Sequence, residues 1–125
     1  MPRLAFAIFG IMLCISVSYG QENARPVSAK TQTCLTCHRS ATPGIVYDWE
    51  SGRHSTKSPA EALKQDYIAR RISARAVPDS LANTVVGCAE CHTLQPEKHE
   101  DTFSHGGREV HTVVTPEDCA ACHPV

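Results

Sequence analysis

The chain lacks a surplus of charge of either sign, and it is short of aromatic residues. Its 125 residues include 12 Lys and Arg against 13 Asp and Glu, and only 6% are aromatic. Nucleic acids and anionic membrane surfaces attract a surplus of basic side chains, so this balance argues against both partners. A chain of this length forms at most one small domain with a modest apolar core. We therefore expect something besides that core to stabilise the fold.

The sequence also lacks an apolar run long enough to cross a membrane. The longest run extends from Leu4 to Val17, after Arg3 and before Ser18-Tyr19-Gly20. It falls short of the roughly 20 residues that a spanning helix needs, and its flanks are those of a secretory signal. We predict a signal peptide over residues 1–20, export to the periplasm or cell surface, and no stable membrane span after cleavage.

Cysteine and histidine, by contrast, are abundant, with seven of each. Cys14 lies within the predicted signal peptide, which leaves six cysteines in the mature chain. Six cysteines in an exported chain first suggest disulfides. Their spacing indicates otherwise, because each pair belongs to a C-x-x-C-H unit and none is left over. The three units are Cys34 to His38, Cys88 to His92 and Cys119 to His123.

The C-x-x-C-H spacing suits covalent attachment of haem. Two thiols form thioethers with the two vinyl groups, and the histidine that follows reaches the iron. Structural zinc takes four ligands from paired units, and a thioredoxin-like dithiol takes one unit beside a βαβ pattern. Neither alternative explains a histidine in the fifth position three times. We predict three covalently attached haem c groups, held by Cys34, Cys37, Cys88, Cys91, Cys119 and Cys122, with proximal ligands His38, His92 and His123.

Four further histidines are candidates for the opposite faces of these three irons: His54, His99, His105 and His111. An iron with two histidine ligands has no open position and transfers electrons only, whereas an iron without a sixth ligand binds small molecules. Pro96, Gly106 and Gly107 predict a loop over residues 93–107, followed by a short extended run over residues 110–114.

The remaining pattern predicts a mainly α fold with extensive loops and little or no β-sheet. A polar, flexible lead-in over residues 21–32 precedes a three-haem module over residues 33–125. A turn at Thr42-Pro43-Gly44 predicts a helix that ends near Gly52. Thr115, Pro116 and Asp118 form a capping pattern that starts the helix of the third motif.

One long helix is predicted between the first two motifs, from Pro59 to Ala76. Ser58 and Glu61 form a capping box at its start, and its apolar face comprises Leu63, Tyr67, Ile68 and Ile72. Its other face carries Lys64, Arg70, Arg71 and Arg75. That basic face could pair with haem propionates or an acidic redox partner, but a solvated face is the simpler interpretation. From the sequence we assign these arginines no function.

The motif surroundings resemble the octahaem hydroxylamine oxidoreductase family. Cys34-Leu-Thr-Cys37-His38, the string T-P-G-I-V-x-x-W-x-x-x-x-H over residues 42–54, and the V-T-P-x-D-C lead-in over residues 114–119 carry the resemblance, which extends over most of residues 33–124. It implies that His54 and His105 are distal ligands, whereas His99 and His111 have no evident counterpart. The predicted helix from Pro59 to Ala76 would be an insertion between the first two haems. For the third iron the distal ligand would be His111, His99 or none.

The resemblance also leaves two interpretations open. Members of that family continue with five more haem segments, including the catalytic one, whereas this sequence stops two residues after His123. The chain is then either a fragment or subunit of an octahaem hydroxylamine-oxidising or nitrite-reducing enzyme, or a small trihaem electron carrier. We do not expect it to catalyse that family's reaction alone, and we assign no catalytic residue. Its partners would be redox proteins or downstream haem domains, and oligomers are compatible with either interpretation.

Overall fold

The computed structural model describes residues 25–124, so the predicted signal peptide lies outside the described residues. Helices take up about half of this part of the chain, and a single two-stranded sheet accompanies them within it. The mainly α fold predicted from the sequence is therefore confirmed. In chain order the elements are α1 (Ala29–Ala41), α2 (Pro43–Ser51), the 3-10 turn η1 (Arg53–Ser55), α3 (Pro59–Leu63), α4 (Tyr67–Arg70), α5 (Asp79–Ala82), α6 (Cys88–His92), the 3-10 turn η2 (Pro96–Lys98), β1 (Phe103–His105), β2 (Arg108–Val110) and α7 (Pro116–Cys119).

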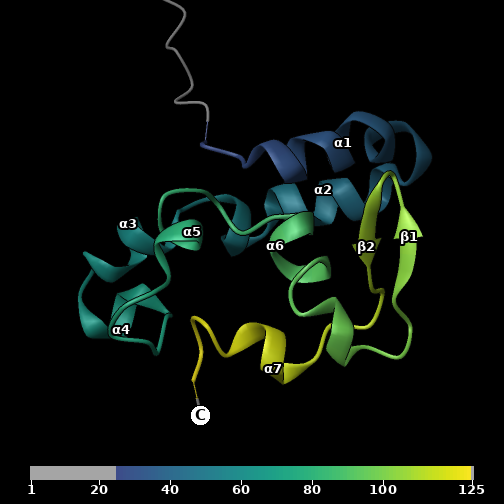
Figure 1. The fold of residues 1–125 in the computed structure, drawn as a ribbon. Coiled ribbons are helices and arrows are strands. Elements are labelled where there is room, and N and C mark those ends of the chain that lie inside the picture. The colour runs from purple at the N-terminus through teal and green to yellow at the C-terminus, as the bar shows by residue number, and fades with distance from the viewer. Residues whose placement is uncertain (1–24, 125) are drawn as a thin grey trace, which may run out of the picture.

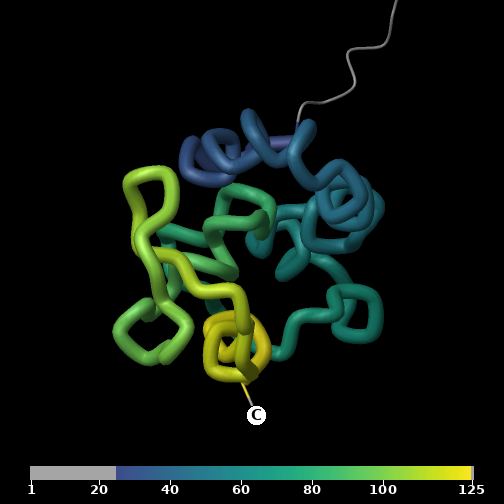
Figure 2. The backbone as a smooth tube through the Cα atoms, turned by 90° about the vertical axis from the view of Figure 1, so that its right-hand side faces the viewer, coloured from purple at the N-terminus to yellow at the C-terminus, as the bar shows by residue number. Residues whose placement is uncertain are grey.

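The three helices that carry cysteine motifs follow one another across the molecule. Figure 1 shows α1 at the top, α6 in the middle and α7 at the bottom, with α3, α4 and α5 on one side and the β1–β2 hairpin on the other. The tube in Figure 2 shows the same three segments from the side, with α6 enclosed by the rest of the chain. The long connections between motifs thus lie around the middle motif.

The first helix begins earlier than the sequence suggested. The lead-in was predicted to extend to residue 32, but α1 starts at Ala29, because the Ser28 hydroxyl accepts a hydrogen bond from the Thr31 amide and caps the helix. Thr31 is fully buried. The next predicted helix is confirmed: α2 has Pro43 in its first turn and ends at Ser51, with Gly52 as its C-cap.

The predicted helix from Pro59 to Ala76 is wrong in its length. Its capping box is present, with Glu61 bound to Ser58, but α3 ends at Leu63. The separate turn α4 ends at Arg70, and its C-cap Arg71 has a left-handed backbone conformation. Tyr67 and Ile68 are 82% and 85% exposed, so the middle of the predicted apolar face is left unpacked, although Ile72 at its end is buried. Helical stability in proteins comes chiefly from packing of such a face, and without it the segment stays broken.

The predicted loop over residues 93–107 is also wrong in part, because it ends in a β-hairpin. Phe103 pairs with Val110 and His105 with Arg108 in an antiparallel register. Gly106 and Gly107 both have positive φ, which is what a two-residue type I′ turn requires and which other residues rarely adopt. The predicted extended run over residues 110–114 continues as strand only to Val110.

A buried hydrogen-bond network joins α1 to α6. The carboxylate of Glu90 accepts hydrogen bonds from the hydroxyls of Ser28, at 2.5 Å, and Thr31, at 2.6 Å, and from the amide of Gly87, at 3.0 Å. The Thr31 hydroxyl in turn accepts from the Ala89 amide. Because Glu90 lies between Cys88 and Cys91, the network fixes the second motif against the helix that carries the first.

The apolar core is small and lies around this junction. The buried apolar side chains are Leu35, Val46, Ile72, Ala74, Val85 and Ala89. Single hydrogen bonds reinforce them: the Trp49 indole donates to the Val86 carbonyl, and the Val86 amide donates to the His54 carbonyl. Within residues 25–124, no helix has the length and apolar character that a membrane span requires.

The close approach of α1 and α6 predicts a marked effect of replacing Gly87 by alanine. A Cβ at Gly87 would lie 2.4 Å from Cγ2 and 2.6 Å from Oγ1 of Thr31. We expect Gly87→Ala to lower the free energy of unfolding by about 1–3 kcal/mol, because a buried clash must be relieved by moving α1 or α6. Denaturant unfolding of the mature protein measures it.

Gly44→Ala is the matched control, because nothing lies within 4 Å of a Cβ built at this position in α2. Alanine is the better helix former, so this variant should be neutral or slightly stabilised. Equal stability of the two variants would contradict a tight contact at Gly87.

Candidate functional site

Each of the three cysteine motifs lies on a helical turn that brings its side chains to one face. The first motif lies in the second half of α1, and α6 consists of the second motif itself. The third begins at the end of α7 and continues the turn, since the His123 amide donates to the Cys119 carbonyl at 2.8 Å. Residues at i, i+3 and i+4 share a helix face, so two thiols and one imidazole converge in each copy.

All six cysteines of the motifs are free thiols in the structure. Burial raises the pKa of Cys91 to about 11 and also raises the pKa of Cys88 and of Cys122. These thiols stay protonated near neutral pH, unlike the low-pKa thiolate of a redox-active dithiol. The environment of the second motif, where both thiols are affected, therefore does not favour a reactive dithiol.

Each motif histidine has one other imidazole opposite it. The ring centres of His38 and His105 are 6.0 Å apart, those of His92 and His111 6.0 Å, and those of His54 and His123 6.3 Å. The partners come from different elements: His54 from η1, His105 from β1, and His111 from the segment after β2. The fold thus brings together three pairs from six histidines that are scattered in the sequence.

These separations fit a metal between the two rings of each pair. A bond from a metal to an imidazole nitrogen is about 2 Å long and the ring centre lies roughly 1 Å beyond the nitrogen, so two imidazoles on opposite sides of one metal have ring centres about 6 Å apart. All three pairs match this value, and two free thiols accompany each pair. The residues present therefore fit haem c with two axial histidines.

Hydrogen bonds orient two of the motif histidines for this role. Nδ1 of His38 lies 2.8 Å from the Thr42 hydroxyl, and Nδ1 of His92 lies 2.8 Å from the His111 carbonyl. A metal-ligating histidine usually donates its other ring N–H to such an acceptor, which leaves Nε2 for the metal. Burial, and then the charge of His123, lowers the pKa of His54 and favours the neutral form that binds metals.

The pairing at the third motif differs from the expectation. The sequence left His111, His99 or no ligand for that copy, but the ring opposite His123 is His54, from the η1 turn that follows the first helical pair. The physical reason is a pair of backbone hydrogen bonds: the amides of Ser73 and Ala74 donate to the Cys122 carbonyl. They hold the third motif against the segment that follows α4.

His111 and His99 instead lie together beside the second motif. Their rings are stacked, 3.5 Å apart and 5° from parallel, and His111 is only 1% exposed. Nε2 of His99 lies 3.1 Å from Oδ1 of Asp118, and both of these side chains are buried. His111 faces His92, so His99 is placed as a neighbour of that pair rather than as part of one.

The ring nitrogens of His111 have unequal contacts. Nδ1 lies 3.0 Å from the Val113 carbonyl and Nε2 lies 3.2 Å from the Leu94 carbonyl. A neutral imidazole has a single N–H, so only one contact is a true hydrogen bond. The position of that proton decides which of the two nitrogens has a lone pair for a metal.

A groove adjoins the third histidine pair. Its volume is about 200 Å³. His54, Cys122 and His123 line it together with basic side chains from η1 and from the end of α4. The groove thus lies beside both histidines and Cys122.

Two acidic residues position the site and were not predicted to do so. Glu90 stands inside the second motif, where nothing in its spacing indicates a partner sixty residues away. Asp118 was predicted only as a helix cap, and it does accept from the Thr115 amide at 2.8 Å, but its other oxygen binds His99. A carboxylate next to a motif cysteine is the only signal that the sequence offers for either role.

Comparison with known proteins supports this interpretation of the site. No protein-family model matches the chain. A solved structure described as "Hypothetical multiheme protein" matches it with a TM-score of 0.76 and 48% sequence identity, over 81% of this chain. The chain is similar to a multihaem protein. It spans about a fifth of the length of that protein, since the match covers 20% of the longer chain. That description does not mention hydroxylamine, so the resemblance to the hydroxylamine oxidoreductase family stays a prediction.

The double role of Asp118 predicts that its charge matters for stability. Burial raises the pKa of Asp118, but hydrogen bonds from Thr115 and His99 outweigh burial and hold it below its usual value. We expect Asp118→Asn to lower the free energy of unfolding by about 1–3 kcal/mol at neutral pH, because one buried acceptor is lost. Denaturant unfolding of the mature protein measures the change.

The pH dependence follows from the sign of that shift. A carboxylate whose pKa is lower in the folded than in the unfolded state stabilises the folded state above its unfolded-state pKa, near 4. This contribution disappears as the pH falls through the folded-state pKa. The difference between the protein and Asp118→Asn should therefore shrink below about pH 4. Glu117→Gln, an exposed neighbour on the same helix, is the control and should have no such effect. A pH-independent difference would argue against a charged Asp118.

Proposed function

We propose that this chain is a periplasmic c-type cytochrome that binds three haems and transfers electrons one at a time. The observation that carries the proposal is that each C-x-x-C-H histidine faces one other imidazole of the same chain, with ring centres 6.0 to 6.3 Å apart. The similarity to a multihaem protein supports it independently. The proposed export rests on the predicted signal peptide. It agrees with covalent haem attachment, which takes place after export.

The proposal gives every site residue a role. The thiols of Cys34 and Cys37, Cys88 and Cys91, and Cys119 and Cys122 would form thioethers with three haems. The axial pairs would be His38 with His105, His92 with His111, and His123 with His54. Haem iron, when bound, supplies a one-electron change between its ferric and ferrous forms. Two imidazoles at each iron leave no open position, so the chain would carry electrons and would not bind a substrate at iron.

The remaining residues would keep the three sites at constant spacing. Glu90 ties the first motif helix to the second, and Asp118 with His99 ties the second site to the third. A fixed spacing lets electrons pass between neighbouring sites without rearrangement of the chain. Electrons would enter and leave through other redox proteins or further haem domains.

The haem count is the first test. We expect three haems per mature chain from pyridine haemochrome absorbance with intact-protein mass spectrometry, after production in a host that attaches haem c. A Cys88→Ala, Cys91→Ala double variant should retain two, because each motif holds its own haem. Bound zinc or three disulfides in place of haem would overturn the proposal.

The axial assignments are tested by removing one distal histidine at a time. His54→Ala, His105→Ala and His111→Ala should each convert one haem of the three to a high-spin form in the ferric electron paramagnetic resonance spectrum, with its thioethers intact. His99→Phe should leave all three low-spin, because the aromatic stack on His111 is kept. Loss of a low-spin signal in His99→Phe, with none in His111→Ala, would exchange the roles of those two residues.

A second candidate function is a module of a larger hydroxylamine-oxidising or nitrite-reducing enzyme. It is favoured by the match to a part, 20%, of a longer multihaem chain. The same spectra distinguish the two candidates. Three low-spin signals that do not move with hydroxylamine or nitrite support a carrier, whereas a high-spin signal of the unaltered protein that shifts on addition supports the enzyme module.

A further inference from the structure

The groove beside the third histidine pair is strongly basic. Four cationic side chains line it, and no Asp or Glu does; the four are Arg53, Lys57, Arg70 and Arg71. Between residues 25 and 124, the ion pairs are Arg39 with Glu50 and His99 with Asp118, so none of the four has a carboxylate partner. Four unpaired cations around one hollow favour an anionic occupant.

Arg70 gives a specific sign of a missing partner. Its Nε is buried and has no hydrogen-bond acceptor. Its guanidinium carbon lies 5.3 Å from the centre of the exposed Tyr67 ring, a cation–π distance. A buried donor without an acceptor is rare in folded proteins, so an acceptor outside the described residues is expected here.

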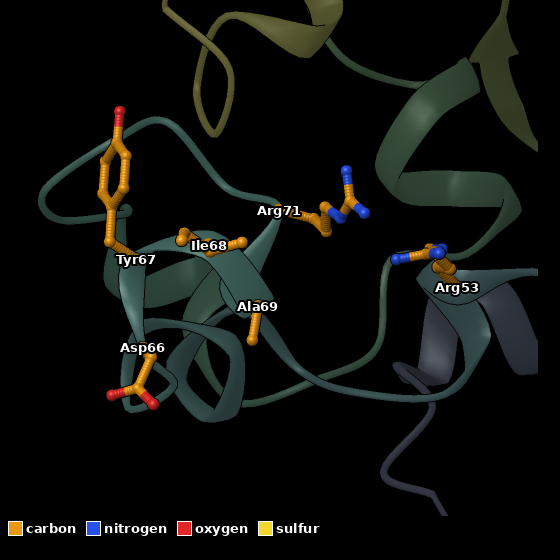
Figure 3. Close-up of a pocket in the computed structure, with 6 residues that line it drawn as sticks. All are labelled: Arg53, Asp66, Tyr67, Ile68, Ala69 and Arg71. Carbon is orange, nitrogen blue, oxygen red and sulfur yellow. The ribbon is translucent and has the colours of Figure 1, made fainter.

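Arg71 and Arg53 point into one shared space. Figure 3 shows a neighbouring pocket that shares Arg53 and Arg71 with the groove: their guanidinium groups are directed toward each other, while Asp66, which also lines this neighbouring pocket, points away from them. Arg71 has a φ of 56° at the end of α4, a left-handed conformation that costs a residue with a side chain about 1–2 kcal/mol. That backbone conformation places the Arg71 side chain at the groove.

We propose that Arg53, Arg70 and Arg71 bind the propionate carboxylates of the haem held by His54 and His123. This inference rests on the proposed function. A haem carries its propionates at the edge away from the vinyl groups, and the groove beside His54 and His123 supplies three arginines that could bind them. Arginine is suited to this role because its planar fork binds a carboxylate with two parallel hydrogen bonds.

The consequence is a raised reduction potential for this haem. Reduction adds one negative charge at the iron, and nearby cations that balance the propionates make that step more favourable. The segment between the first two motifs, whose arginines were assigned no function from the sequence, would then set the potential of the third haem.

The experiment compares reduction potentials of the mature three-haem protein and its variants by spectroelectrochemical titration. Arg71→Gln and Arg53→Gln should each lower one of the three potentials and leave the other two unchanged. Arg71→Lys should keep most of the original value because it keeps the charge. Arg75→Gln is the matched control, since Arg75 is exposed and does not line the groove. The His54→Ala variant, whose altered haem lies in this groove, identifies which potential belongs to it.

Arg71→Gly serves as a second variant in case Arg71→Gln folds poorly. Glycine removes the same charge, and it adopts the left-handed backbone conformation without strain. Unchanged potentials in Arg53→Gln and Arg71→Gly, with three haems present, would overturn the propionate assignment and leave the proposed function intact. Fewer than three haems in the unaltered protein would instead overturn the proposed function. A saturable fall of one potential on adding phosphate would show that the groove takes a free anion, because bound phosphate offsets the cations, and it would also overturn the assignment.

Discussion

The arrangement of the motifs depends on the hydrogen bonds that the Glu90 carboxylate accepts. Glu90 is placed between the two cysteines of the second motif, and it accepts hydrogen bonds from Ser28 and Thr31 at the start of α1. A small domain buries too little apolar surface to fix several helices by packing alone. A short, charge-assisted network in a tight junction supplies the missing specificity, because its geometry tolerates little displacement. The absence of a Cβ at Gly87 is what allows Thr31 to come so close.

With α1 and α6 joined in this way, the fold contains three imidazole pairs with nearly equal separations, although the partner histidines come from different kinds of element. One partner comes from a tight β-hairpin, one from a 3-10 turn, and one from the segment after the hairpin that is buried against His99. A chain that itself supplies both histidines of each pair would need no second subunit to provide an axial ligand. The same chain is similar to a part of a longer multihaem protein, so the module is compatible with both a separate and an embedded existence.

The parts of the site that could be predicted from sequence are those with local signals. The three C-x-x-C-H units, the Ser58 and Glu61 capping box and the start of the last helix at Pro116 depend on residues within one turn of each other. Which histidine faces which depends on contacts between distant segments, so the partner of His123 could not be derived from spacing. The predicted long helix failed for a related reason: the periodicity of Tyr67 and Ile68 describes an apolar face, but only the fold decides whether anything covers it. The hairpin was overlooked because adjacent glycines indicate a loop and a type I′ turn equally well.

The histidine pairs also differ in how far apart their members lie along the chain. His92 and His111 are joined by one short stretch of loop and hairpin, whereas His38 and His105, like His54 and His123, join opposite halves of the described residues. Closing a short loop costs less conformational entropy than closing a long one, and it happens sooner during folding. The middle pair therefore needs the smallest loss of chain entropy to form, and the two outer pairs need the larger one.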